Sequence, residues 1–192
     1  MPNGARDTAR PVFLMGNLTN AHLNMAELNM TEHYLYPGER WFGRGKMQLR
    51  TLLGSCVAIT LWHPGRGIGG MCHYLLPEDP GKSRSRPLDP RYADEAMALF
   101  LKDIKHSSTC PADYQVGLFG GGNMFTTLER AWSVDIGRRN AAFGRLLLRR
   151  HGFSVAYEDL EGRTHRQIIL DMRDGTLVLR RGTEHSMVLP AR

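Results

Sequence analysis

The chain has 192 residues, of which 42% are hydrophobic and 23% charged, and these proportions exclude global disorder and suit a single globular domain. No apolar run approaches the roughly 20 residues that cross a bilayer, and residues 1–10 lack the apolar core of a signal peptide, so we expect a cytoplasmic protein. The net charge of +6 suits an acidic partner. Because the basic residues are mostly dispersed Arg, nucleic acid has little support, and an acidic protein surface fits the charge equally well.

Cysteine usage excludes two classes of small scaffold. The three cysteines are Cys56, Cys72 and Cys110, and none belongs to a Cys-x-x-Cys pair. A disulfide framework and a structural zinc site are therefore not expected. The eight histidines show no i, i+4 pairing, which gives a metal site little support. What remains is a set of free thiols, one of which could be a nucleophile.

The N-terminal part is expected to be a flexible extension, residues 1–32, followed by one domain over residues 33–192. Within the extension, the apolar residues between positions 23 and 30 could form a short helix. From His33 the pattern predicts a strand that ends at the turn Pro37-Gly38.

Two apolar runs around a turn predict a β-hairpin. The runs are Thr51–Trp62 and Gly67–Leu76, and His63-Pro-Gly-Arg66 separates them. If those four residues form the loop, Trp62 pairs with Gly67, and Cys56 then pairs with His73. Directly opposed residues lie on one face of the sheet with Cβ atoms about 4.5–5.5 Å apart. A loop of another length would place the two side chains on opposite faces.

The remaining elements mix strands and helices without regular alternation. Proline, glycine and charges make residues 78–90 a loop. Apolar periodicity predicts helices over 92–105 and 136–151, and strands are predicted over 116–119, 154–157, 167–171 and 176–180. Because strands outnumber helices, we expect an α+β fold: a mixed, antiparallel-rich β-sandwich with flanking helices.

The predicted pairing of Cys56 with His73 carries the chemistry. A neighbouring imidazolium lowers the pKa of a thiol, so we expect a thiolate near neutral pH and an imidazole that can return a proton to a leaving amine. Gly54-Ser55 permits a sharp bend whose backbone N–H groups could hold an oxyanion. The alternative is that Cys56 is a small buried apolar residue and His73 a hydrogen-bonded core histidine.

Two other segments bear on this candidate site. The glycine run 120–122 with Asn123 lacks the spacing of a phosphate-binding loop, and we expect a tight turn that packs against the site. Cys72 precedes His73 on the same strand, so it should point to the opposite face and belong to the core.

Several ordered motifs resemble the CheD family of chemoreceptor glutamine deamidases. The motifs are Thr51-Leu-Leu-Gly-Ser-Cys56-Val-Ala, Gly69-Gly-Met-Cys-His73-Tyr-Leu-Leu-Pro77, Arg91-Tyr-Ala-Asp94, Phe119-Gly-Gly-Gly-Asn-Met-Phe125, Ile136-Gly-Arg-Arg-Asn140, and Glu158-Asp159 with Gly162 and Arg166. The similarity extends over roughly residues 34–182. It implies a mixed α/β sandwich similar to the catalytic domain of bacterial cytotoxic necrotizing toxins.

The resemblance also implies an activity, the conversion of glutamine side chains on methyl-accepting chemotaxis receptors to glutamate. The family's Cys and His correspond to Cys56 and His73, with no metal or organic cofactor, and its third residue, a Thr, corresponds to Thr51. Some members have this Thr six positions before the Cys, where the present chain has Arg50. An odd offset from Cys56 puts Thr51 on the opposite face of a regular strand, and a bend at Gly54-Ser55 would bring it back. Gly54, Ser55 and Asn123 are expected to support the loop and the oxyanion.

Two alternatives to this activity stay open. One is a cysteine hydrolase that acts on another amide or on the receptor's methyl esters. The other is a non-catalytic adaptor that binds a chemoreceptor or a CheC-type phosphatase. The five arginines of the helix predicted over 136–151 suggest a surface that guides an acidic receptor, although a solvated face that aids solubility explains them as well.

Overall fold

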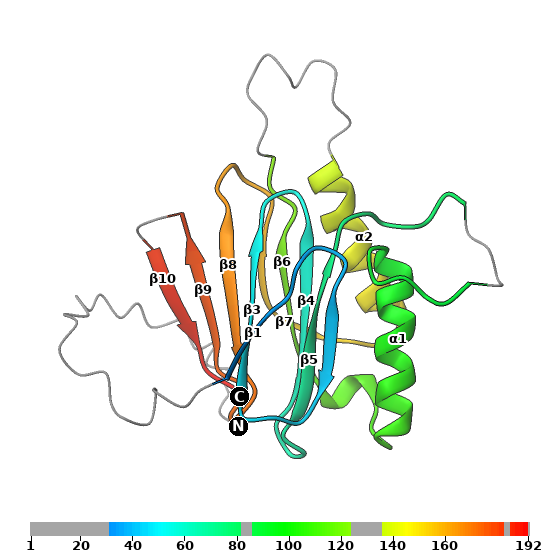
Figure 1. Ribbon diagram of the computed structural model, residues 1–192, viewed down its shortest axis with the longest axis vertical. Coiled ribbons are helices and arrows are strands. Elements are labelled where there is room, and N and C mark those ends of the chain that lie inside the picture. The colour runs from blue at the N-terminus through cyan, green and yellow to red at the C-terminus, as the bar shows by residue number, and fades with distance from the viewer. Residues whose placement is uncertain (1–30, 82–85, 124–135, 183–184, 192) are drawn as a thin grey trace, which may run out of the picture.

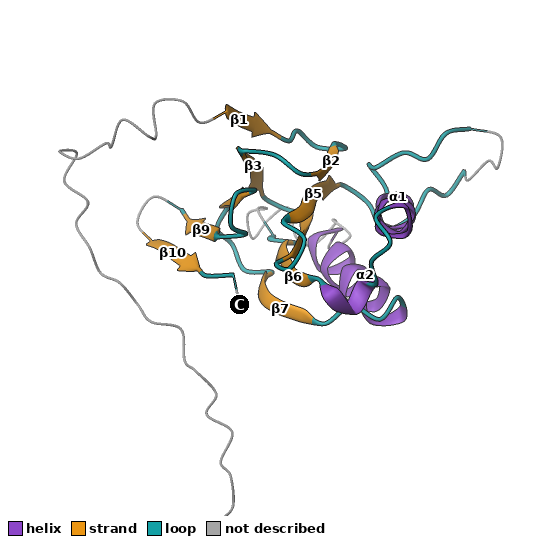
Figure 2. Cartoon of the chain, turned by 90° about the horizontal axis from the view of Figure 1, so that it is seen from below, coloured by secondary structure: helices purple, strands orange, loops and turns teal. Residues whose placement is uncertain are grey.

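A computed structural model describes residues 31–81, 86–123, 136–182 and 185–191. Two five-stranded sheets pack face to face, and two helices cover the outer face of one sheet only (Figures 1 and 2). Among the strands of the described residues, β1–β3 and β6–β7 pair in parallel and the other pairs are antiparallel. The α+β sandwich that the sequence predicts is therefore confirmed.

Each sheet combines strands from distant parts of the chain. The first has the order β1 (Thr31–Tyr34), β3 (Met47–Leu53), β8 (Arg166–Asp171), β9 (Leu177–Arg181) and β10 (His185–Leu189). The second has the order β2 (Arg40–Gly43), β5 (Ile68–Tyr74), β4 (Val57–His63), β6 (Gln115–Gly120) and β7 (Val155–Leu160). Helices α1 (Ala93–His106) and α2 (Ile136–Arg150) flank the second sheet.

The chain passes from one sheet to the other at Gly54–Cys56. The sequence predicts one strand over Thr51–Trp62, and that prediction is wrong, because Thr51 belongs to β3 of the first sheet, which ends at Leu53, whereas β4 begins at Val57 in the second sheet. Burial explains the difference. Along β3 exposed and buried residues alternate, as in a strand with one solvated face, whereas β4 is buried on both faces. The apolar run hides this change of environment.

The β4–β5 hairpin exists, but its register differs from the prediction. His63 pairs with Ile68, and the loop is Pro64–Gly67. The Gly67 N–H donates to the His63 carbonyl at 2.9 Å while Gly67 adopts a φ of +57°, a value that favours glycine. The loop has the predicted length but starts one residue later. As a result His73 lies opposite Ala58 rather than Cys56.

Two apolar cores fill the molecule. The core between the sheets includes Leu49, Ala58, Met71 and Phe119, and the core between the second sheet and the helices includes Ile59, Cys72, Tyr74 and Phe100. The prediction that Cys72 faces away from His73 into a core is confirmed, because successive residues of β5 alternate between the two cores.

The helices and most strands lie within a few residues of their predicted positions, and β2 and β10 were not predicted. The short helix expected between positions 23 and 30 lies outside the described residues. Thr31 and Glu32, which the sequence assigns to the extension, belong to β1.

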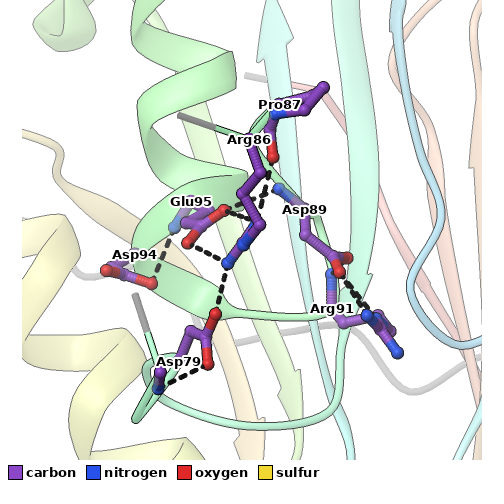
Figure 3. Close-up of polar contacts among 8 residues, drawn as sticks. Asp79, Arg86, Pro87, Asp89, Arg91, Asp94 and Glu95 are labelled. Atoms are coloured by element: carbon purple, nitrogen blue, oxygen red, sulfur yellow. Dashed lines mark hydrogen bonds and ion pairs between the residues drawn. The ribbon is translucent and has the colours of Figure 1, made fainter. Parts of the chain in front are cut away.

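A charged cluster anchors the loop that follows β5 to the start of α1 (Figure 3). The Arg86 guanidinium donates to both Glu95 carboxylate oxygens, at 2.8 and 2.9 Å, and to Asp79 at 2.5 Å. Glu95 also accepts the Asp89 N–H at 2.7 Å. Glu95 is 2% exposed, and its buried carboxylate is paired with the Arg86 guanidinium. The cluster therefore holds the loop against the helix.

Candidate active site

His73 lies on β5 at the inner face of the second sheet, with Thr51 of the first sheet next to it. Their Nδ1 and Oγ1 atoms are 2.7 Å apart, and both residues are almost fully buried. The crossing at Gly54–Cys56 brings Thr51 there, because it puts Thr51 on a different sheet from β4. The bend that the sequence analysis required for Thr51 is present.

Hydrogen bonding sets the tautomer of the His73 ring. The Thr51 hydroxyl has one proton, which it donates to the Leu35 carbonyl at 2.8 Å, so its oxygen accepts the His73 Nδ1–H. The neutral ring then carries its lone pair on Nε2. That atom is buried and has no hydrogen-bond partner among the described residues. A buried, oriented and unpartnered imidazole nitrogen can act as a general base.

Cys56 precedes β4 and packs against the inter-sheet core, on the side where Ala58 and His73 also lie. The predicted direct opposition of Cys56 and His73 is wrong, and Cys56 takes a position diagonal to His73, one residue beyond the end of the ladder. The two residues nevertheless share a face, because the register shift is an even number of positions. Cys56 is partly exposed, in contrast to the buried Cys72.

Burial governs the pKa of both groups. It raises the pKa of the Cys56 thiol, with the residue's own backbone N–H opposing, and it lowers the pKa of His73. Both directions favour the uncharged forms. Desolvation therefore acts against the thiolate–imidazolium pair that the sequence analysis expects.

The glycine run after β6 holds the Cys56 segment in place. The Gly121 N–H donates to the Cys56 carbonyl at 2.8 Å, and the Gly122 N–H donates to the Gly54 carbonyl at 2.7 Å. The glycine run packs against the Cys56 segment as expected, but residues 121–123 do not form the expected turn. The Asn123 N–H donates to the Gly162 carbonyl at 2.8 Å. Within the described chain, no backbone carbonyl accepts the N–H of Ser55 or of Cys56.

Sequence reasoning missed two buried polar residues around this segment. Asn140 of α2 donates through Nδ2 to the Ser55 and Leu75 carbonyls. Arg166 pairs with Asp159 and donates to the Gly120 carbonyl, next to the glycines that hold Cys56. Both residues belong to motifs given in the sequence analysis. Their role would have been visible only if the sequence had shown that a polar residue occupies a position facing the core. Burial of a position depends on tertiary packing, which a single sequence does not display.

The arginines of α2 differ in their environment. Arg145 makes a two-bond pair with Glu158, at 2.6 and 2.9 Å, and a second ion pair with Glu161 at 3.6 Å. The positive charge of Arg145 is therefore compensated by Glu158 and Glu161 of the same chain. Arg149 and Arg150 are exposed at the C-terminal end, far from the Asn140 contact with the Cys56 segment.

In the described part of the chain, no three His, Cys, Asp or Glu side chains lie close enough together to hold a metal ion. Nor does any helix in the described ranges have the length and apolarity needed to cross a membrane.

Comparison with known proteins gives one consistent family. The family model described as CheD chemotactic sensory transduction matches residues 75–181, a range that begins just after His73. The chain is 42% identical to the probable chemoreceptor glutamine deamidase CheD 3 of Dechloromonas aromatica, covering 82% of this chain and 91% of the relative. It is 44% identical to a probable chemoreceptor glutamine deamidase CheD of Pseudomonas fluorescens, covering 78% of this chain and 84% of that one.

A more distant relative has the same name. The probable chemoreceptor glutamine deamidase CheD 1 of Leptospira interrogans is 38% identical and covers 80% of this chain and 93% of its own length. Among solved structures, the hypothetical protein YfiH of Bacillus licheniformis aligns with a TM-score of 0.38 and 14% identity, over 64% of this chain and 49% of that one. That likeness is too weak to support an argument.

Proposed function

The chain belongs to the CheD family, and on that premise we propose that it is a cytoplasmic protein-glutamine deamidase that converts glutamine side chains of methyl-accepting chemotaxis receptors to glutamate. The names of its relatives support the reaction and the substrate class. The observation that carries the mechanism is the His73 ring, whose Nδ1 is engaged by Thr51 while its Nε2 is free within the described residues, on the same face as Cys56.

The first half of the reaction forms a thioester. The Cys56 thiol gives its proton to His73 Nε2, and the sulfur attacks the carboxamide carbon of the glutamine. The tetrahedral intermediate collapses when the imidazolium returns that proton to the departing nitrogen, which leaves as ammonia. Because burial raises the pKa of Cys56 and lowers that of His73, proton transfer from the thiol accompanies its attack on the substrate.

The second half hydrolyses the thioester. His73 Nε2 removes a proton from water, the resulting hydroxide attacks the acyl carbon, and the proton then returns to the sulfur as glutamate is released. Thr51 acts as a positioning residue that keeps Nε2 as the basic nitrogen throughout. The backbone N–H groups of Ser55 and Cys56, which have no other backbone acceptor in the described chain, would hold the oxyanion in both halves.

The experiment uses the purified protein with a chemoreceptor signalling domain. We expect wild type to release ammonia and to convert receptor glutamines to glutamate, as measured by peptide mass. Cys56→Ala should abolish both signals and keep the fold. Cys72→Ala is the matched control, since that thiol lies in the helix-side core with its pKa raised to about 12, and it should remain active.

The alternatives predict different results. Methanol release from a methylated receptor, without ammonia, would identify a methylesterase. Receptor binding with no product in either assay would identify an adaptor. Equal deamidation by wild type and Cys56→Ala would contradict the thiol mechanism. A CheC-type phosphatase as a second partner stays a prediction.

A further inference from the structure

Asn140 is tied to both segments that carry the reacting groups. Its Nδ2 donates to the Ser55 carbonyl at 3.2 Å, one residue before Cys56, and to the Leu75 carbonyl at 2.7 Å, two residues after His73. The side chain is fully buried. A carboxamide NH₂ group has two protons, and here each proton holds a different strand end.

The helix must lie very close to the sheet for this short side chain to reach both carbonyls. On the same face of α2, a Cβ built on Gly137 would lie 2.6 Å from the Gly121 carbonyl oxygen, and one on Gly144 would lie 2.4 Å from the Tyr74 hydroxyl. Only glycine fits at these two positions. The Tyr74 hydroxyl also donates to the Asn140 backbone carbonyl at 2.8 Å, which fixes the helix at the same residue.

No ladder hydrogen bond replaces this tie. The β4–β5 pairing ends at Val57 and Tyr74, so Ser55, Cys56 and Leu75 lie beyond it. The glycine run holds the Cys56 segment to β6, not to the strand that carries His73. Of the contacts described here, the Asn140 side chain is the one that bridges the two segments directly.

We propose that Asn140 is a positioning residue that sets the placement of the Cys56 sulfur relative to His73 Nε2. The proposal rests on the deamidase mechanism above and adds a residue to it. Loss of the bridge lets the two segments separate beyond the end of the ladder. A displacement of about 1 Å between reacting groups can cost about 10²-fold in rate.

The test compares Asn140→Ala and Asn140→Leu with Leu148→Ala. Leu148 is fully buried on the same helix but packs in the helix-side core, so its truncation lowers stability without touching the bridge. We expect both Asn140 variants to lower kcat for ammonia release by about 10–100-fold with KM within about threefold of wild type. Leu148→Ala, assayed below its melting temperature, should keep kcat within about threefold.

A second readout needs no receptor. Alkylation of Cys56 by iodoacetamide is measured in four proteins: wild type, His73→Gln, Asn140→Leu and the double variant. If Asn140 couples the two groups, His73→Gln should slow alkylation several-fold in the wild-type background and less than about twofold in the Asn140→Leu background. This cycle separates positioning from a general loss of structure.

Each result decides the proposal. Equal effects of His73→Gln in both backgrounds, or kcat of Asn140→Leu near wild type, would overturn it. Failure of both Asn140 variants to fold would assign Asn140 to stability and also overturn it. A wild-type protein that releases no ammonia would contradict the proposed function, while the alkylation cycle would still judge the role of Asn140.

Discussion

Two polar clusters of the described structure differ in whether their hydrogen-bonding groups have partners. Around Arg86 and Glu95, carboxylates, guanidinium and backbone N–H groups meet within hydrogen-bonding distance, and the cluster lies in a loop with no thiol or imidazole (Figure 3). Around His73, by contrast, burial is deeper and the Nε2 atom has no partner among the described residues. A buried unpaired polar atom costs free energy, and at His73 it leaves a basic nitrogen that no other group of the described chain occupies.

Within the second cluster, only part of the ring is left free. Thr51 engages Nδ1 while its own proton goes to the Leu35 carbonyl, and this arrangement leaves the lone pair of the neutral ring on Nε2. The comparison therefore separates three kinds of residue: those that only hold the fold, those that orient a reacting group, and the reacting groups themselves. Substitutions should distinguish them.

Removing the hydroxyl that orients His73 should have the largest effect. Thr51→Val keeps the shape of the side chain but lets the ring adopt either tautomer, and we expect kcat for ammonia release to fall by about 10²-fold. Stability should also fall, because the Leu35 carbonyl and His73 Nδ1 lose a buried partner. Thr60→Val is the matched control, because Thr60 is also a buried threonine in a strand. Equal kcat values for the two variants would show that Thr51 does not orient His73.

Breaking the satisfied cluster should affect stability instead. Glu95→Ala leaves the Asp89 N–H and the Arg86 guanidinium without their main acceptor, and we expect the melting temperature to fall by about 3–10 °C. Cys56 alkylation should keep its wild-type rate at a temperature where the variant is folded. Glu78→Ala, an exposed glutamate of the same loop, should melt like wild type.

The pH dependence of stability should report the buried ring. Burial lowers the pKa of His73 in the folded protein below its ordinary value of 6.5, so the unfolded state takes up the proton first as the pH falls. The free energy of unfolding should therefore decrease as the pH falls below 6.5, with a slope from this single group of at most about 1.4 kcal/mol per pH unit.

Urea unfolding of wild type and His73→Gln across this range measures that term. The difference in unfolding free energy between the two proteins should shrink as the pH is lowered below 6.5. Parallel curves would mean that the ring takes up its proton equally well in both states, and that the folded environment does not keep it neutral.

The arginines of α2 should give the smallest effect. Glu158 and Glu161 compensate the charge of Arg145, whereas Arg149 makes no ion pair within the described residues. If the helix guides an acidic receptor, Arg149→Gln should lower kcat/KM by about twofold at low salt, less at high salt, and more than Arg145→Gln does. A larger loss for Arg145→Gln than for Arg149→Gln would contradict guidance by uncompensated charge.

Local patterns in the sequence were sufficient for several parts of the protein. The hairpin, both helices, the sandwich class and the orientation of Cys72, away from His73, depend on apolar periodicity and on turn residues, which act over a few neighbours along the chain. Cys56, His73 and Thr51 could also be identified as candidate site residues, because they belong to two motifs that lie close together in the sequence.

Tertiary structure alone decided how these residues meet. Gly67 takes the last position of the hairpin loop, and this shifts Cys56 from opposite His73 to a diagonal position. Equally, the passage between sheets at Gly54–Cys56 is invisible in a continuous apolar run, yet it is what places Thr51 against the ring.

The pKa directions and the bridge from Asn140 have the same origin. Desolvation of Cys56 and His73 depends on what the whole fold packs around them, and so does the contact of a helix with two strand ends far away in sequence. The sequence by itself determined which chemical groups are present and on which local elements they lie. Their register, burial and partners were decided by long-range packing, because those properties are set by residues that are distant in the chain.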